Sequence, residues 1–330
     1  MKQYEYCARR RHLLQAAAAG PLLGFGAAGA AQTLAPGIAK FIIPFTPGTT
    51  PDAIARVLAP HLSAKLGRDF VVDNRAGASG IIGMDAVAKA EPNGLTAMVT
   101  TNTTLTLPYF YKKVPFDVID SFEPIALVGA INFALVVHPS VPAKNVKEWV
   151  AYVKSQQGKV DYASPGRGTL HSLALEKIAI ATGVQLNHIP YKGTAGAMAD
   201  LMGGHVPMMI LPLNMVVPLE AEGKLRIIGS TRAGRDSLHP HVVPLQEGGV
   251  PDFDESAWAA VWGPKGMDPQ LVAAYNRAIN EALTDEGVKK SMLSQGVVLT
   301  PGSPETLRKM AVAEYEKWGR VVREANLQAE

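Results

Sequence analysis

The residues of this sequence best suited to bind a ligand are hydroxyl side chains and glycines that directly follow short apolar segments. The clearest case is Phe-Thr-Pro-Gly-Thr-Thr at positions 45–50, which closes the apolar run Ile38–Phe45. Thr50 is predicted to cap a helix whose first residue is Pro51, where the missing proline N–H costs nothing. A helix start presents unpaired N–H groups and a positive dipole end, which together hold an anion. We therefore predict that this first loop contacts an anion through Phe45, Thr46, Gly48, Thr49 and Thr50. The alternative is that these residues only cap the helix and form the turn.

Three other segments place small or hydroxyl residues where predicted strands end. A second glycine loop, Asn74–Gly80, offers Ala78 and Ser79. The next strand, Thr96–Thr101, ends in Thr101 and Asn102. A third loop, which we call the facing loop, covers residues 164–169 and is predicted to supply backbone amides from Ser164, Gly166, Gly168 and Thr169. Asp52 is interpreted as mainly structural, and Arg56, one turn later, as its ion-pair partner.

The sequence lacks the residue patterns that catalysis or metal binding needs. It contains no G-x-S-x-G elbow and no H-E-x-x-H pair, so an exported hydrolase is the weaker alternative. His239 and His241 flank a proline without further ligands nearby, and His171 lies in a predicted first helical turn, where a protonated imidazole is disfavoured. We predict a protein that is not an enzyme and that uses no cofactor and no metal ion.

Strand and helix patterns alternate along the chain, which favours parallel α/β units. The apolar run Ile125–Val137 is too long for one strand and could pass between two domains. The apolar segment Val206–Leu219 is excluded as a membrane span by its three prolines and Asn214. The predicted strands are 38–45, 69–73, 96–101, 160–163, 187–190, 225–230 and 258–262; the predicted helices start at 51 and cover 81–90, 146–156, 170–182, 194–202, 269–283 and 304–326.

The first 30 residues have the pattern of an export signal. Adjacent arginines, Arg9–Arg11, precede an Ala/Gly/Leu-rich segment, and Ala28-Gly29-Ala30 fits a cleavage site, so we expect twin-arginine-like export and cleavage near Ala30/Ala31. Removing residues 1–30 lowers the Lys and Arg count from 32 to 28 and the Asp and Glu count from 29 to 28. The mature chain is then close to neutral, which gives no reason to expect a nucleic-acid partner. Cys7, the only cysteine, lies in the same segment.

Six short motifs, in order, resemble those of the solute receptors of tripartite tricarboxylate transporters, known as Bug or TctC-like proteins. The first loop with Asp52 and Arg56 is similar to their opening PFxPGGxxDxxAR, and the second loop to N-[RK]-x-G-A-x-G. The resemblance covers essentially the whole mature chain. Thr49 and Arg167 differ from the residues that the family usually has at these positions. The other four matching segments are 111–117, 164–171, 190–193 and 200–204.

The resemblance implies an α/β, two-domain periplasmic-binding-protein fold with a ligand cleft between the domains and two crossover strands. It implies domain 1 at 31–130 plus 258–330, domain 2 at 131–257, and a monomer that passes a small organic carboxylate to the membrane permease subunits. A receptor that signals to a sensor kinase is the other alternative. In such a cleft Arg167 would either pair with a second, distal carboxylate or sit in water at the rim. Tyr191 would stack on the ligand, close the cleft or pack in the fold.

Overall fold

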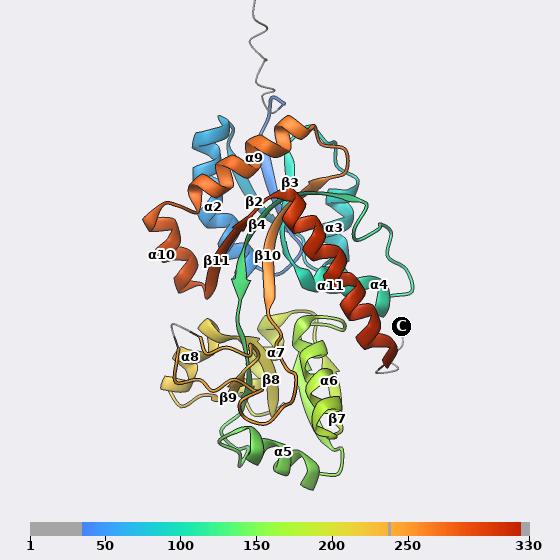
Figure 1. The fold of residues 1–330 in the computed structure, drawn as a ribbon, viewed down its shortest axis with the longest axis vertical. Coiled ribbons are helices and arrows are strands. Elements are labelled where there is room, and N and C mark those ends of the chain that lie inside the picture. The colour runs from blue at the N-terminus through green and yellow to red at the C-terminus, as the bar shows by residue number, and fades with distance from the viewer. Residues whose placement is uncertain (1–34, 237–238, 325–330) are drawn as a thin grey trace, which may run out of the picture. The chain divides into compact units, whose positions relative to one another are not determined.

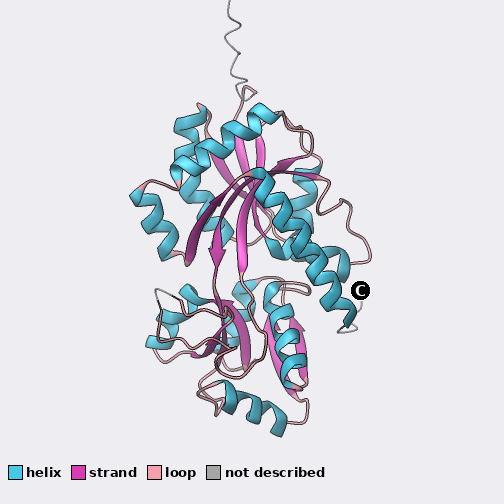
Figure 2. Ribbon diagram, in the orientation of Figure 1, coloured by secondary structure: helices cyan, strands magenta, loops and turns pink. Residues whose placement is uncertain are grey.

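The computed structural model describes residues 35–236 and 239–324, which fold around two β-sheets (Figure 1). The predicted export signal and its cleavage point lie outside the described residues. Helices cover both faces of each sheet, as Figure 2 shows. We call the part built on the six-stranded sheet the first lobe and the part built on the five-stranded sheet the second lobe. The predicted domain boundaries stay a prediction.

The sheet of the first lobe has the strand order β11-β4-β10-β3-β1-β2. Successive side chains of a strand point to opposite faces, so Phe41 and Ile43 pack with α2 and α9, whereas Ile42 packs with α3 and α11. The strands of this lobe are β1 (Ala39–Ile43), β2 (Phe70–Asn74), β3 (Thr96–Thr101), β4 (Phe122–Ile131), β10 (Ala257–Pro264) and β11 (Val297–Gly302). Its α-helices are α2 (Thr50–Leu66), α3 (Ile81–Ala88), α4 (Leu107–Phe110), α9 (Pro269–Ala282), α10 (Glu286–Ser294) and α11 (Pro304–Glu324).

The sheet of the second lobe has the strand order β7-β6-β8-β5-β9. Leu135 and Val137 of β5 pack in the larger buried cluster with α5 and α6, and Ala134 and Val136 of the same strand pack with α7 and α8. The strands are β5 (Phe133–Val137), β6 (Val160–Ser164), β7 (Leu186–Pro190), β8 (Met208–Pro212) and β9 (Arg226–Ser230). The helices are α5 (Val146–Ser155), α6 (Leu170–Thr182), α7 (Thr194–Met202) and α8 (Leu213–Ala221).

Two strands carry the chain between the lobes. The predicted apolar run 125–137 divides at Asn132 into β4 in the first sheet and β5 in the second. The chain returns through a segment at 231–256 into β10, which lies between β3 and β4. Because β4 leaves the first lobe and β10 re-enters it, the two strands pair antiparallel, from Ala257↔Ile131 to Pro264↔Phe122. Ile131 and Ala257, which pair across these two strands, therefore lie side by side where the lobes are connected.

The prediction of parallel units holds only for part of each sheet. β1 is parallel to β2 and β3, and β6 is parallel to β7 and β8. β10 is antiparallel to β3 and β4, and β5 is antiparallel to β8 and β9, because the strands that connect the lobes reverse the chain direction. Five of the described α-helices and strands had no predicted counterpart, namely α4, β8, α8, α10 and β11.

The prolines explain why part of the second lobe is hard to read from sequence. Pro212 is the last residue of β8 and also precedes the first residue of α8, and Pro218 lies inside that helix. Helix and strand patterns normally exclude proline, so this segment does not match either pattern. None of the helices in the described ranges is long and apolar enough to cross a membrane.

Candidate functional site

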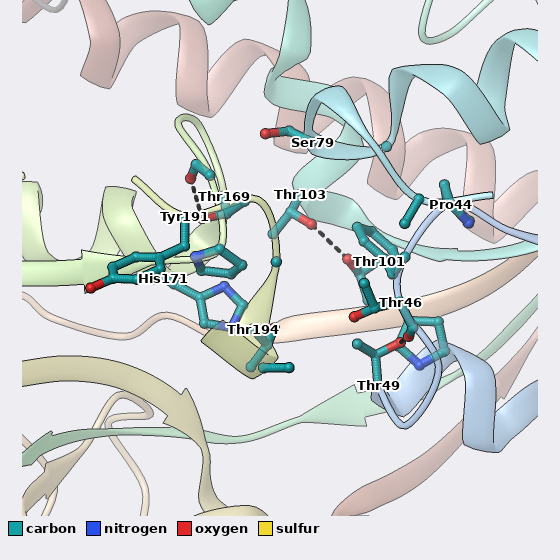
Figure 3. A pocket seen from close by; sticks show the side chains of 18 of the residues that line it. Pro44, Thr46, Thr49, Ser79, Thr101, Thr103, Thr169, His171, Tyr191 and Thr194 are labelled. Atoms are coloured by element: carbon teal, nitrogen blue, oxygen red, sulfur yellow. Dashed lines mark hydrogen bonds between the residues drawn. The ribbon is translucent and has the colours of Figure 1, made fainter. Parts of the chain in front are cut away.

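A cavity of about 650 Å³ lies between the two lobes and is bordered by the loops at the strand ends (Figure 3). Figure 3 shows Thr46, Thr49 and Thr101 of the first lobe across the cavity from Thr169, His171 and Tyr191 of the second. Most of the predicted site residues line it: Phe45, Thr46, Gly48, Thr49, Thr50, Ala78, Ser79, Thr101, Gly166, Arg167, Thr169 and Tyr191.

The first loop is held by a carboxylate beneath it. Asp52 Oδ2 accepts a hydrogen bond from the Gly48 N–H at 3.0 Å, and Arg56 pairs with the same carboxylate at 3.0 Å. Burial alone would raise the pKa of Asp52, but hydrogen bonds from Arg56, Gly48 and Asn74 outweigh it and hold that pKa below its usual value. The structural roles predicted for Asp52 and Arg56 are confirmed. The Gly48 N–H, which was predicted to face the anion, is used inside the loop.

The helix start is one residue earlier than predicted. The N-cap of α2 is Thr49, and Thr50 is already helical, with Pro51 in the first turn. The Thr49 hydroxyl does not cap the helix; it donates to the Thr46 carbonyl at 2.9 Å. Thr49 and Thr50 N–H groups form no hydrogen bond with a described residue. The first loop therefore presents uncapped N–H groups at the cavity.

The facing loop repeats this arrangement in the second lobe. Thr169 is the N-cap of α6, its hydroxyl does not cap the helix, and it donates instead to the Gly166 carbonyl at 2.8 Å. Both threonine hydroxyls thus donate to the backbone carbonyl three residues earlier in the chain. Two helix N-termini are left without a side-chain cap, one on each side of the same cavity.

The second loop holds two non-glycine residues in a left-handed conformation. Ala78 has φ 46° and Ser79 φ 53°, a region that costs L-residues about 1–2 kcal/mol. The Ser79 hydroxyl bonds the Tyr111 hydroxyl at 2.7 Å and reaches the Arg167 carbonyl of the other lobe at 3.4 Å. This strained loop is therefore a direct contact between the lobes, at the edge of the cavity.

Three predicted residues lie behind the cavity wall. The Asn102 amide donates to Glu314 at 3.0 Å, and its oxygen accepts from the Trp258 N–H, so it joins α11 to β10. The Ser164 hydroxyl bonds Gly166 and His188 and shapes the facing loop. The Gly168 carbonyl accepts from the Thr106 hydroxyl. The structure brings none of the three to the cavity lining.

His171 and two methionines are cavity residues that the sequence interpretation did not select. His171 lies in the first turn of α6, packs edge-on against Phe133 at 5.1 Å between ring centroids, and has a buried Nδ1 without a hydrogen-bond partner. Burial lowers the pKa of His171 to about 3, so the imidazole is neutral at physiological pH. Met198 lies in a predicted helix, where a methionine usually belongs to the core, and Met215 lies in α8, for which no helix was predicted.

Acid is expected to destabilise the protein through His171. Its imidazole binds a proton in the unfolded chain below about pH 6.5 but remains neutral in the folded chain until about pH 3. The stability from neutral His171 is therefore complete above pH 6.5 and is lost as the pH falls, by up to about 1.4 kcal/mol per pH unit. The free energy of unfolding of a His171→Gln variant should fall less steeply between pH 6.5 and 4.5.

An exposed imidazole provides the control for this measurement. His241→Gln removes a histidine from a surface turn of the same lobe. If His171→Gln and His241→Gln have the same pH slope as the parent protein, the buried imidazole does not contribute to acid sensitivity.

Comparison with known proteins identifies the family of this chain. A family model described as the tripartite tricarboxylate transporter family receptor, TctC, matches residues 54–327. The chain belongs to this receptor family. The sequence resemblance is thereby confirmed, and the family is one of binding proteins without enzymatic activity.

Individual proteins also match over nearly the whole chain. Protein BugT of Bordetella pertussis is 35% identical over 290 residues, which are 86% of this chain and 88% of BugT. The solved periplasmic binding protein BugD is 29% identical with a TM-score of 0.82, and the match covers 88% of this chain and 98% of BugD. An R. palustris protein solved with adipate is 28% identical with a TM-score of 0.85, over 89% and 98% of the two chains. The predicted periplasmic-binding-protein fold is confirmed.

Proposed function

We propose that this TctC receptor captures a small organic carboxylate in the periplasm and delivers it to the membrane subunits of a tripartite tricarboxylate transporter. The observation that carries the proposal is the pair of uncapped helix N-termini, α2 and α6, on opposite sides of one cavity. Such N-termini stabilise an anion through N–H groups and the helix dipole. Solved relatives hold adipate and, in MatC of Rhodopseudomonas palustris, malate.

Closure of the two lobes over the ligand supports delivery. The lobes already touch through Ser79, Arg167 and Gly168, and a bound anion between α2 and α6 would add contacts to both. The liganded form then differs from the empty form in shape, which a membrane partner can recognise. Recognition of the same form by a sensor kinase remains the alternative. A pull-down of membrane proteins with and without ligand separates the two.

Carboxylates are expected to bind reversibly, with one ligand per chain and no turnover. The test is calorimetry on mature protein with mono- and dicarboxylates of two to eight carbons, together with thermal unfolding. A ligand at 100 times its Kd should stabilise the folded state by about 2.7 kcal/mol. If no acid of this set binds to the folded protein, or if an ester or amide is hydrolysed at an enzyme-like rate, the proposed function is wrong.

The same calorimetry decides the role of Arg167. Burial lowers the pKa of His188, and the positive charge of Arg167 lowers it further. His188 is not among the residues that line the cavity. We therefore expect Arg167→Ala to weaken adipate and hexanoate by the same small factor, as for a residue at the rim. A charge-assisted contact with a distal carboxylate is worth about 1.5–3 kcal/mol, so a loss of more than about tenfold for adipate alone would place Arg167 in contact with the ligand.

A further inference from the structure

The described lining of the cavity contains hydrogen-bond donors but no acidic or amide side chain. Among the described residues that line it, none is an aspartate, glutamate, asparagine or glutamine. These are the side chains that normally accept hydrogen bonds from ammonium and hydroxyl groups of a ligand. The uncapped N–H groups of Thr49 and Thr50 are donors, and Arg167 and Lys192 of the lining carry only donors at their charged ends.

Four backbone carbonyls of the loops already accept hydrogen bonds from side chains of the protein: Phe45 from Asn74, Thr46 from Thr49, Gly166 from Ser164 and Thr169, and Arg167 from Ser79. These four carbonyls are therefore already engaged and are poor substitutes for an acidic side chain in recognising an ammonium group.

Several hydroxyls of the lining are paired in the same way. Thr101 bonds Thr103 at 2.7 Å, and Ser79 bonds Tyr111 at the same distance. Thr49 and Thr169 donate to loop carbonyls, as described above. A ligand with several hydroxyl groups would have to compete with these internal bonds.

Much of the second-lobe wall is apolar. Tyr191, Met198 and Met215 are each partly exposed at the cavity, and the buried residues Phe133 and Pro212, which pair across β5 and β8, lie on the same wall. Neutral His171 packs on Phe133. An ammonium group turned toward these apolar side chains would lose its hydration without gaining a charged partner.

We infer that the ligand of this receptor is a carboxylate that carries no hydrogen-bond donor: an alkyl, aryl or oxo acid, in preference to an amino acid or a hydroxy acid. This inference rests on the proposed function and narrows its ligand class. The carboxylate accepts from the uncapped N–H groups of the loops. The remainder of the ligand contacts Tyr191, Met198 and Met215.

The test compares acids that differ in one group on the same carbon. Adipate, 2-oxoadipate, 2-hydroxyadipate and 2-aminoadipate share their length and both carboxylates, and the matching series of four and five carbons removes the dependence on ligand length. An unsatisfied buried donor weakens binding by about ten- to a hundredfold. In the length that binds best, we expect the oxo acid to bind within about threefold of the parent acid and the amino acid at least about tenfold more weakly.

The outcomes separate the inference from the proposed function. If the amino or hydroxy acid binds as tightly as the parent acid, the inference is overturned while carboxylate capture stands. If no acid of any length binds to the folded protein, both are overturned. A weaker oxo acid alongside an equally weak amino acid would show that the cavity rejects any polar substituent, and would overturn the assignment to hydrogen-bond donors.

A pair of methionines on one helix gives the matched variants. Met198 lines the cavity, and Met202, one turn later on α7, is 38% exposed and is not among the lining residues. Met198→Gln introduces an amide oxygen, an acceptor, at nearly constant side-chain length. We expect it to reduce the preference for adipate over 2-aminoadipate by about fivefold or more, whereas Met202→Gln leaves that preference unchanged. An equal shift in both variants would show that the preference does not arise at this wall.

Discussion

Replacing Gly168 with alanine is expected to weaken carboxylate binding by about tenfold or more, because the added methyl group would force the two lobes apart. A Cβ at this position would lie 2.5 Å from Cδ2 and 2.9 Å from Cγ of Phe110. Phe110 belongs to α4 in the first lobe and is only 7% exposed, so its ring has little room to move. Overpacking of this kind costs about 1–3 kcal/mol, which is about five- to a hundredfold in affinity when the cost falls on the closed form.

An alanine at position 168 has two effects, the contact with Phe110 and backbone strain, and a control variant is needed to separate them. Gly168 has φ +71°, so alanine is strained there even in open space. Gly183, at the end of α6, has φ +66° and no atom within 4 Å of an added Cβ. Gly183→Ala is therefore the control: it should lower the free energy of unfolding by a similar amount without changing affinity. Equal ligand affinity in both variants would show that the Gly168–Phe110 approach does not limit binding.

The secondary structure around the cavity was largely predictable because its signals are local. The bounds of α6, α7 and β3 match the prediction, since caps, glycines and apolar periodicity mark them directly. The first loop was also found by its proline and hydroxyl pattern. The cap itself moved to Thr49, because the Asp52 carboxylate takes the Gly48 N–H and fixes the loop one residue earlier.

The polar role of a residue was harder to predict than its place in the fold. Asn102 and Ser164 lie at the ends of strands just as Thr101 and Gly166 do, but their side chains turn inward and bond Glu314 and His188. Local sequence cannot show which side of a loop a side chain takes. The apolar wall has a similar cause, because Met198 and Met215 lie on separate helices that only the fold of the second lobe brings to one cavity.

The sequence also did not reveal a cluster of ion pairs around Glu255. The carboxylate is 2% exposed and contacts Lys177 of α6 at 2.6 Å and Lys317 of α11 at 2.9 Å. Lys317 also pairs with Glu314 at 3.0 Å. Burial lowers the pKa of Lys317, but the Glu255 and Glu314 carboxylates outweigh burial and raise the pKa above its usual value. One buried carboxylate thus joins a helix of each lobe, far apart in sequence.

Glu255→Gln is expected to lower the free energy of unfolding by about 2 kcal/mol. The substitution keeps the shape of the side chain but removes the charge that two lysines share, and hydrogen bonds to charged groups are worth about 1.5–3 kcal/mol each. The lysine side chains are 29% and 35% exposed, so water replaces part of what is lost and the effect stays below that of a fully buried pair.

The matched control is Glu247→Gln, which removes a carboxylate from an ion pair with Arg235 at the surface. Its two side chains are 51% and 45% exposed, and pairs of this kind are worth about 0–1 kcal/mol. Urea unfolding of the three proteins compares them directly. If Glu255→Gln costs no more than Glu247→Gln, the cluster is an incidental contact. A larger loss, accompanied by weaker carboxylate binding, would show that the angle between α6 and α11 is part of what positions the uncapped start of α6 at the cavity.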